Sequence, residues 1–264
     1  MKMEEQTHTR IRNPYLADLE KIEFVITYAC TGKCKHCSQG DHPRQGLSID
    51  AEIASRMVRE VAERASIRTL MTFGGEPLLY PETVCAIQRV GLEMGIPKRQ
   101  LITNGFFSKS RETIKDVARR LAESGINDLL LSVDAFHQET VPLETVLLFA
   151  RAALEYKIPL RTQPAWLVSD TDNNPYNRET RRILAIFAEM GIGENNGNVI
   201  FPSGNAARYL GDYFDSSREI CDPYEEDPKR IRTLSVEPTG DVLDGNLYRQ
   251  SIVDIMESYG DQLL

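Results

Sequence analysis

The sequence has no apolar run that approaches the roughly 20 residues needed to span a bilayer, so no transmembrane helix is expected. Positive charge is also in short supply, with 31 Lys and Arg against 39 Asp and Glu and a formal net charge of −8. Nucleic-acid binding normally requires clustered basic residues, which this balance disfavours. The first twenty residues mix charges with Pro14 and Tyr15 and do not match a secretory signal. We therefore expect a cytoplasmic protein without a nucleic-acid or membrane partner.

Cysteine is scarce, yet three of the five cysteines fall within eight residues, at Cys30, Cys34 and Cys37. An acidic chain with no export signal is not expected to use them as a disulfide framework. They follow a short apolar run at 24–28, which predicts a β-strand that delivers a loop. Three thiolates on one compact loop can hold three corners of a cubane iron–sulfur cluster, and the fourth iron then lacks a protein ligand.

These cysteines allow two other interpretations. A structural zinc site could add His36 to the three thiols, but zinc sites usually draw ligands from two separated pairs, and adjacent His36 and Cys37 would reach one ion with difficulty. Buried thiols without a ligand would not explain why three of five share one loop. The spacing therefore favours an iron–sulfur cluster.

Strand-like and helix-like segments alternate over most of the chain, which predicts a parallel sheet covered by helices in an α/β fold. Six strand–helix units fall short of eight and predict a partial, open (β/α)6 TIM barrel, with a doubly wound open sheet as the alternative. Ser48 is the expected cap of the first helix. The expected strands are 24–28, 68–73, 100–103, 128–133, 159–166 and 198–202, and the expected helices are 50–65, 81–92, 111–124, 143–156 and 178–190.

The pattern changes after about residue 212. Segments 233–238 and 241–243, joined at Thr239-Gly240, predict a small C-terminal β-hairpin, and 251–259 predicts a short amphipathic helix. The expected division is an N-terminal extension at 1–21, the barrel at 22–211 and a C-terminal extension at 212–264.

The C-x3-C-x2-C spacing directly after the first strand resembles the radical S-adenosylmethionine (radical SAM) superfamily. The segment Gly74-Gly75-Glu76-Pro77, one strand later, resembles the GGE motif of that family, and its glycines let backbone approach a ligand closely. The resemblance implies a partial barrel and one [4Fe-4S] cluster held by Cys30, Cys34 and Cys37. It also implies S-adenosylmethionine bound through its methionine amino end by Gly74, Gly75 and Glu76.

Polar residues end the following strands, where a parallel barrel builds its active site. By resemblance, hydroxyls and carboxylates there suit the ribose and methionine groups of the cofactor, although turn and capping roles account equally well for Asn104 and Asp134. Arg161 and Gln163 alternate with apolar neighbours and can face the barrel interior; surface exposure is the alternative. The cofactor-binding candidates from these strands are Thr103, Asn104, Ser132, Asp134, Arg161 and Gln163.

The tail resembles the SPASM or shorter Twitch extension, which holds auxiliary clusters in several groups of the family. It contains a single thiol, Cys221, and one thiol cannot anchor another cubane, so we expect one cluster. Cys221 is a candidate hydrogen donor in catalysis, with a structural role as the alternative. Ser203-Gly204-Asn205 resembles a segment near the adenine, and Phe136-His137 is either a contact to substrate or cofactor or an exposed loop.

The resemblance implies reductive cleavage of S-adenosylmethionine, with an electron from a flavodoxin or ferredoxin, to a 5′-deoxyadenosyl radical that takes a hydrogen atom from the substrate. Relatives with such tails often modify ribosomally made peptides, so a peptide or small metabolite is the expected substrate. The alternative function is an iron–sulfur electron-transfer or scaffold protein that cleaves no cofactor. Only the enzyme interpretation explains the GGE-like segment and the polar strand ends.

Overall fold

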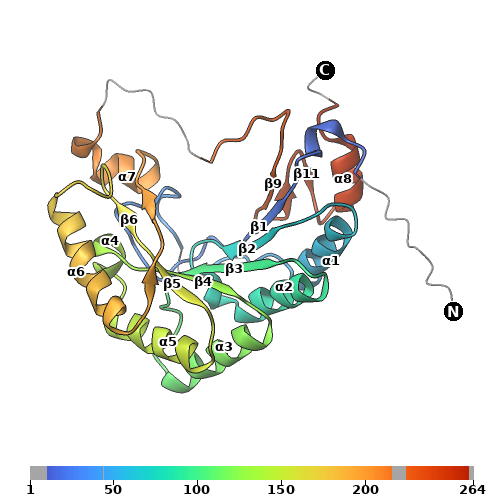
Figure 1. The fold of residues 1–264 in the computed structure, drawn as a ribbon. Helices are drawn as coiled ribbons and strands as arrows, with labels where there is room; N and C mark the ends of the chain where they lie inside the picture. Colours follow the sequence, from blue (N-terminus) through green and yellow to red (C-terminus); the bar gives the residue numbers. More distant parts are fainter. Residues whose placement is uncertain (1–10, 44, 216–223, 262–264) are drawn as a thin grey trace.

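A curved, seven-stranded sheet organises the computed structural model, which describes residues 11–43, 45–215 and 224–261 (Figure 1). The strand order is β7-β5-β4-β3-β2-β1-β9, and every neighbouring pair is parallel. The sheet does not close, because β7 and β9 are its two edges. This confirms the partial barrel. The strands are β1 Lys21–Val25, β2 Thr69–Phe73, β3 Lys98–Thr103, β4 Asp128–Ser132, β5 Leu160–Gln163, β7 Gly193–Glu194 and β9 Thr233–Val236.

Helices cover the convex face of this sheet (Figure 1). The first helix begins one residue after Asp50, whose side chain accepts hydrogen bonds from the Glu52 and Ile53 amides, so Asp50 and not Ser48 is the cap. The α6 helix starts earlier than expected because Pro175 is favourable at a first helical position, where no donor is needed. The main helices are α1 Ala51–Ala62, α2 Pro81–Glu93, α3 Arg111–Glu123, α5 Leu143–Glu155 and α6 Pro175–Glu189.

Several short elements lie at the ends of the sheet, and those near the barrel mouth position the candidate site. They are the 3-10 turns η1 Pro14–Leu16, η2 Pro77–Leu79 and η3 Gly211–Tyr213, the helices α4 Ala135–Gln138, α7 Gly204–Tyr209 and α8 Ile252–Ser258, and the strands β6 Ala165–Trp166, β8 Asn198–Val199, β10 Asp241–Val242 and β11 Gly245–Asn246.

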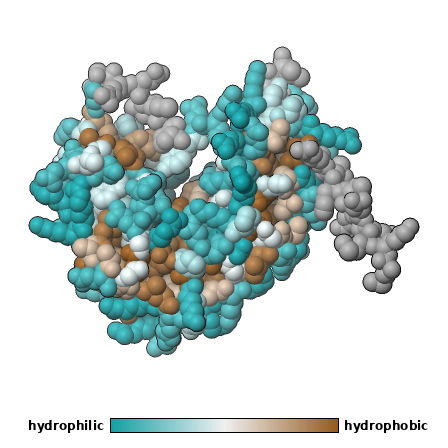
Figure 2. Space-filling view, viewed as in Figure 1, coloured by the Kyte–Doolittle hydropathy of each residue, from teal (hydrophilic) through white to brown (hydrophobic). Residues whose placement is uncertain are grey.

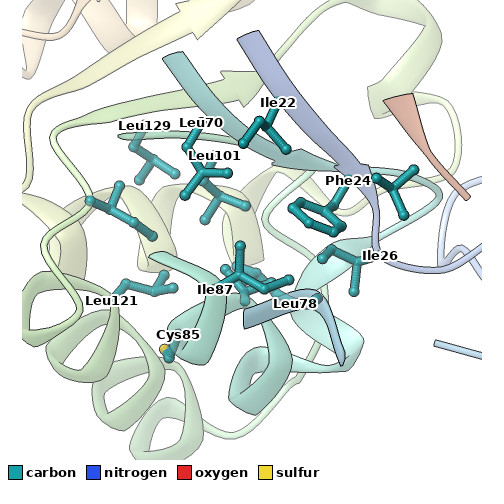
Figure 3. Close-up of a cluster of buried hydrophobic side chains, with 14 of the residues drawn as sticks. Ile22, Phe24, Ile26, Leu70, Leu78, Cys85, Ile87, Leu101, Leu121 and Leu129 are labelled. Atoms are coloured by element: carbon teal, nitrogen blue, oxygen red, sulfur yellow. The ribbon is translucent and has the colours of Figure 1, made fainter. Parts of the chain in front are cut away.

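The main hydrophobic core lies between the sheet and the helices. Alternate strand residues point into it, among them Ile22, Phe24 and Leu70, all with no exposed surface (Figure 3). Cys85 of α2 belongs to the same cluster and is 4% exposed, so this thiol is a small buried apolar group. Because these side chains are fully buried, β1 and β2 have fixed orientations, and so do the starts of the loops that follow them.

The expected fifth and sixth strands differ from those observed. Residues 159–166 form two strands, since Pro164 separates β5 from β6 and proline supplies no backbone donor. The β6 strand leaves the main sheet and pairs with β8. The sixth strand of the barrel is therefore β7, only two residues long, and not the segment at 198–202.

The expected C-terminal hairpin is also wrong in its pairing. Residues 233–236 form β9, which lies parallel to β1 with Lys21 opposite Thr233 and Phe24 opposite Val236. The hairpin forms one connection later, between β10 and β11, and α8 packs near α1. The first strand of the tail thus extends the barrel sheet. None of the helices in the described ranges combines the length and apolar character needed to cross a bilayer.

We predict that Phe24→Ala lowers the free energy of unfolding by about 3–5 kcal/mol, because a fully buried ring is replaced by a cavity. Leu154→Ala on the exposed face of α5 is the matched control, with an expected change within about 0.5 kcal/mol. Urea unfolding followed by circular dichroism measures both; equal losses would show that the core does not lie between β1 and the helices.

Candidate functional site

The three clustered cysteines lie on the loop that leaves β1, which we call the cysteine loop and define as residues 27–43. The residue before this loop extends the sheet, since the Ile26 amide donates to the Phe73 carbonyl at 2.8 Å. The Thr27 hydroxyl donates to the Leu47 carbonyl at 2.7 Å. The Cys30 amide donates to the Pro43 carbonyl at 2.9 Å and closes the loop. Backbone contacts therefore hold the loop in a compact form.

Two of the thiols, those of Cys30 and Cys34, lie beside Gly32. A Cβ at this glycine would lie 3.2 Å from Cys34 Sγ and 3.7 Å from Cys30 Sγ, so the missing side chain leaves room between the two sulfurs. Burial, with the charge of Glu76, raises the pKa of Cys30 to about 12. Burial also raises the pKa of Cys34, and the neighbouring thiols add to the effect. These thiols are neutral unless a metal replaces their protons.

The distances between the possible ligand atoms distinguish a site for a single metal ion from a site for an iron–sulfur cluster. Among the described residues, the group whose ligand atoms all lie within 4.8 Å of one another is Cys34, His36 and His137. The three thiols do not form such a group, so one ion on Cys34 and the two histidines would leave Cys30 and Cys37 unused. A cubane, in which each iron takes its own thiolate, uses all three. The donor set therefore fits an iron–sulfur cluster.

The Gly74-Gly75 segment at the end of β2 lies directly against the start of the cysteine loop. The Gly75 amide donates to the Thr27 carbonyl at 2.8 Å. A Cβ on Gly75 would lie 2.2 Å from the Ala29 oxygen, and one on Gly74, at a φ of +142°, would lie 2.6 Å from the Thr27 oxygen. Only glycine permits this approach. The motif that the sequence assigned to cofactor binding thus also fixes the position of the thiols.

The Glu76 carboxyl is buried and points into the protein. One oxygen accepts hydrogen bonds from the Thr103 hydroxyl at 2.6 Å and the Leu78 amide at 2.9 Å. The other accepts from the Asn104 amide at 2.9 Å. Burial raises the pKa of Glu76 to about 7, although these hydrogen bonds oppose the shift. The side chain therefore ties the end of β2 to the end of β3.

Asn104 lies beside the first cysteine. Its Nδ2 is 3.6 Å from Cys30 Sγ and donates to the Thr31 hydroxyl at 3.2 Å, while its Oδ1 accepts from the Phe106 amide at 2.8 Å. The sequence predicted a cofactor contact for Asn104 and Thr103. The structure brings Asn104 to the cysteine loop, whereas the Thr103 hydroxyl donates to Glu76.

The far end of the cysteine loop is held by the segment that begins α7. A Cβ on Gly204, at a φ of +51°, would lie 2.4 Å from the Ser38 oxygen. The next residue, Asn205, donates from its amide to the Cys37 carbonyl at 2.9 Å and from its side chain to the Cys34 carbonyl at 3.3 Å. A second glycine contact therefore clamps the loop.

Asp134 follows β4 and is fully buried. It accepts hydrogen bonds from the Phe136 and His137 amides, both at 2.9 Å, and from the Ala165 amide at 3.1 Å, and it lies 2.7 Å from His137 Nδ1. Burial opposes its ionisation, but His137 outweighs burial and lowers the pKa of Asp134 to about 2. Ser132, two residues earlier, ends β4 and is 9% exposed.

The His36 ring fills the space between the cysteines and α4. Its centroid lies 5.1 Å from that of Phe136 and 4.7 Å from that of His137. Burial and the neighbouring His137 lower the pKa of His36 to about 4, so the ring is neutral. His36 Nδ1 is buried without a hydrogen-bond partner. A polar atom left in this state beside the thiols is consistent with a site built for a bound group.

Arg161 and Gln163 lie on the sheet face opposite the helices. Arg161 donates to Asp128 at 2.6 Å and to Asn195 at 2.7 Å, so its charge is compensated within the chain. Gln163 donates to Asn198 at 3.3 Å and accepts from Asn195. To contact the cofactor as predicted, Arg161 and Gln163 would have to give up these hydrogen bonds.

Sequence reasoning missed His42. Its Nε2 lies 3.1 Å from Cys37 Sγ and its Nδ1 lies 2.7 Å from the Tyr28 carbonyl oxygen. The available signal was a histidine five residues after the third cysteine. Cys221, the candidate hydrogen donor, lies outside the described residues.

The surface has a hollow between the part of the molecule that contains α6 and α7 and the part that contains β9 and α8. Hydrophilic residues lie on both sides of this hollow (Figure 2). A separate cavity of about 640 Å³ lies beside α6 and β7, with Trp166 and Arg181 in its wall. None of the four cysteines that the structure describes lines that cavity, so it is not part of the thiol site.

Together, a partial parallel barrel and three thiols on the loop after its first strand define a class of cluster-dependent enzymes. The model of the radical SAM superfamily matches residues 24–162, and the chain belongs to this superfamily. The cofactors of the family are a [4Fe-4S] cluster and S-adenosylmethionine.

Curated relatives match slightly less than half of this chain. A GTP 3′,8-cyclase of Chlorobaculum tepidum is 26% identical over 121 residues, which cover 46% of this chain and 34% of that protein. The "Putative peptide biosynthesis protein YydG" of Bacillus subtilis is 20% identical over 125 residues, 47% of this chain and 39% of that protein. The chain therefore spans about a third of the length of the cyclases it matches.

A solved structure extends the similarity in fold. The structure described as native anSMEcpe with bound AdoMet has a TM-score of 0.56 and 15% sequence identity, and the match covers 90% of this chain and 80% of that chain. At this identity the match supports the partial barrel and no finer statement.

We predict that Gly75→Ala prevents cluster assembly, because the added methyl would lie 2.2 Å from a backbone oxygen of the cysteine loop. Iron per chain after anaerobic reconstitution should fall from about four to a small fraction of that value. Gly211→Ala is the matched control, since a Cβ there has no atom within 4 Å. An iron content in the Gly75 variant equal to that of the wild type would show that the contact between Gly75 and the cysteine loop is not needed for cluster assembly.

The raised pKa of Glu76, about 7 against 4.5 for an unburied carboxyl, gives a pH-dependent stability. The folded state binds this proton more tightly, so the contribution is present below pH 4.5 and is lost as the pH rises through 7. We predict that the stability advantage of the wild type over Glu76→Gln shrinks by about 3 kcal/mol over this interval. Urea unfolding at several pH values measures the difference; a constant difference would show that folding does not raise the pKa of Glu76.

Proposed function

We propose that this chain is a radical SAM enzyme that uses one [4Fe-4S] cluster to cleave S-adenosylmethionine reductively and to abstract a hydrogen atom from a peptide or small metabolite. The observation that carries the proposal is that three thiols lie on one short loop, which glycine contacts clamp at both ends. These contacts hold the loop against the end of β2 and the start of α7, which supports a working cluster site.

In this proposal Cys30, Cys34 and Cys37 hold the cluster as thiolates. When bound, the cluster supplies the electron that cleaves S-adenosylmethionine, and the resulting 5′-deoxyadenosyl radical takes a hydrogen atom from the substrate. The protein contributes position and exclusion of water. Gly74 and Gly75 keep the strand end free of side chains, and Ser132 presents a hydroxyl at the end of β4. A flavodoxin or ferredoxin is the proposed reductant.

The substrate class is inferred from the sheet face that the helices leave uncovered. Asp128, Arg161 and Gln163 lie there with the amides of Asn195 and Asn198. Amide side chains can donate to and accept from peptide groups, and the opposite charges suit a polar or zwitterionic ligand. A peptide-related name among the similar proteins agrees with this substrate class.

We predict that the wild-type protein, reconstituted anaerobically and supplied with dithionite and S-adenosylmethionine, forms 5′-deoxyadenosine. Replacement of all three site cysteines by Ala should reduce the product below detection, because no thiolate remains to hold the cluster. Chromatography with mass detection measures the product. Cys85→Ala is the matched control, since that thiol belongs to the hydrophobic core and not to the cysteine loop.

Two outcomes would contradict this proposal. A cluster that forms with about four irons and four sulfides per chain, yet supports no cleavage with dithionite or a stronger reductant, would favour the electron-carrier function. About eight irons per chain would overturn the single cluster. Deuterium transfer from a labelled candidate peptide into 5′-deoxyadenosine would then identify the substrate directly.

A further inference from the structure

The cavity of about 640 Å³ beside α6 lies at an open edge of the barrel sheet. Strand β7 is the last strand on this side, and its one neighbour among the described strands is β5. Both residues of β7, Gly193 and Glu194, are exposed and belong to the wall of the cavity. The volume falls in the range of ligand pockets, roughly 300–1,000 Å³. The edge of the sheet and the cavity therefore form one accessible surface.

The backbone of β7 has one side without a partner strand. Successive residues of a strand direct their backbone groups to alternate sides. The Asn195 amide donates to the Thr162 carbonyl at 2.8 Å, so Asn195 faces β5. Glu194, the residue before it, therefore directs its N–H and C=O away from β5, to the open edge. A strand edge in this state is a template for an extended peptide.

The side chains after and within β7 serve both faces of the sheet. Glu194 lies opposite Thr162 in the register, and both residues line the cavity. Asn195 points to the other face, where its Oδ1 accepts from Arg161 at 2.7 Å and where we propose that the substrate lies. A peptide paired with β7 would present alternate side chains to the cavity and to that face. A small free ligand would not reach both.

The wall of the cavity contains carboxylates without a cationic partner. Among the described residues, neither Asp170 nor Glu194 forms an ion pair, although both line the cavity. The cation in the wall is Arg181, which donates to the backbone carbonyls of Asp170 at 2.6 Å and Asp172 at 3.1 Å and lies 5.5 Å from the centroid of the Trp166 ring. Burial raises the pKa of Glu194, and the charge of Arg181 offsets this effect only in part.

We propose that the cavity holds a lysine or arginine side chain of the peptide substrate, which pairs as an extended strand with the open edge of β7. Leu184, Ala188 and Ile192 line the cavity and suit the methylene groups of such a side chain. Its charged end forms a cross-strand pair of opposite charge with Glu194. This inference rests on the proposed function, since it takes a peptide as the substrate of this chain.

The test uses the fluorescence of Trp166, which is the single tryptophan of the chain and lines the cavity. The probe is the capped peptide acetyl-Thr-Val-Lys-Val-Thr-amide, titrated into the anaerobically reconstituted protein. We expect a saturable change in emission. The same peptide with Gln in place of Lys should bind about fivefold more weakly, because the charge pair with Glu194 is lost. Methylation of the Lys backbone nitrogen should also weaken binding about fivefold, because one hydrogen bond to the strand edge is lost.

The variant that tests the site is Glu194→Gln. Its affinity for the Lys peptide should fall about fivefold, while its affinity for the Gln peptide should equal that of the wild type. Glu179→Gln is the matched control, because it also removes one carboxylate from this side of the molecule. Glu179 lies on α6 but pairs with Arg182 at 3.3 Å and does not line the cavity, so its variant should bind the Lys peptide as the wild type does.

Four results would overturn this inference. They are equal affinity for the Lys and Gln peptides, an equal loss of affinity in Glu194→Gln and Glu179→Gln, and unchanged affinity for the methylated peptide. The fourth is butylamine that binds as tightly as the Lys peptide, which would assign the cavity to free amines. A dimer in solution that Glu194→Lys dissociates would assign the edge to a second copy of the chain and would also overturn the peptide.

Peptide binding and cofactor cleavage are separate measurements. The protein with all three site cysteines replaced by Ala should bind the Lys peptide with the affinity of the wild type, because no cysteine of the described residues lines the cavity. Peptide binding by a wild type that cleaves no S-adenosylmethionine would overturn the proposed function and leave the peptide site in place. Cleavage by a wild type that binds no peptide would overturn this inference alone.

Discussion

The architecture of the site depends on backbone contact that a side chain would prevent. Gly75 lies against Ala29 at one end of the cysteine loop, and Gly204 lies against Ser38 at the other. The two clamping segments are about 130 residues apart in sequence, at the ends of different strand–helix units. Because the thiols take their positions from these contacts, their geometry is a property of the whole barrel and not of the loop alone.

Electrostatics around the thiols act in opposite directions. Glu76 raises the pKa of Cys30 and Asp134 raises that of Cys34, so both buried carboxyls oppose negative charge on sulfur. His137 lies 2.7 Å from Asp134 and lowers the pKa of that carboxyl, which keeps it ionised beside Cys34. The site is therefore built so that thiolates form only when a metal takes the place of their protons.

The sequence predicted the features that depend on local pattern. Alternating segments indicated the parallel barrel, and Gly74-Gly75 was expected at the second strand end, where it lies. The pairing of β9 with β1 was missed because a short apolar alternation does not specify its partner, and β7 was missed because two residues carry no pattern. Glu76 shows the same limit within the site. Its residue type predicted a functional role, but its side chain points inward because Thr103, at the end of β3, and Asn104, directly after it, donate hydrogen bonds to it.

The tail contributes to the site although no thiol of its described part does so. Its strand β9 pairs with β1, the strand that delivers the cysteine loop. Directly after β9, Glu237 accepts a hydrogen bond from the Tyr28 hydroxyl, and the carbonyl of Tyr28 orients His42 beside Cys37. A continuous chain of contacts thus runs from the tail to a cluster ligand. The tail thus has a structural role at the site that requires no thiol of its own.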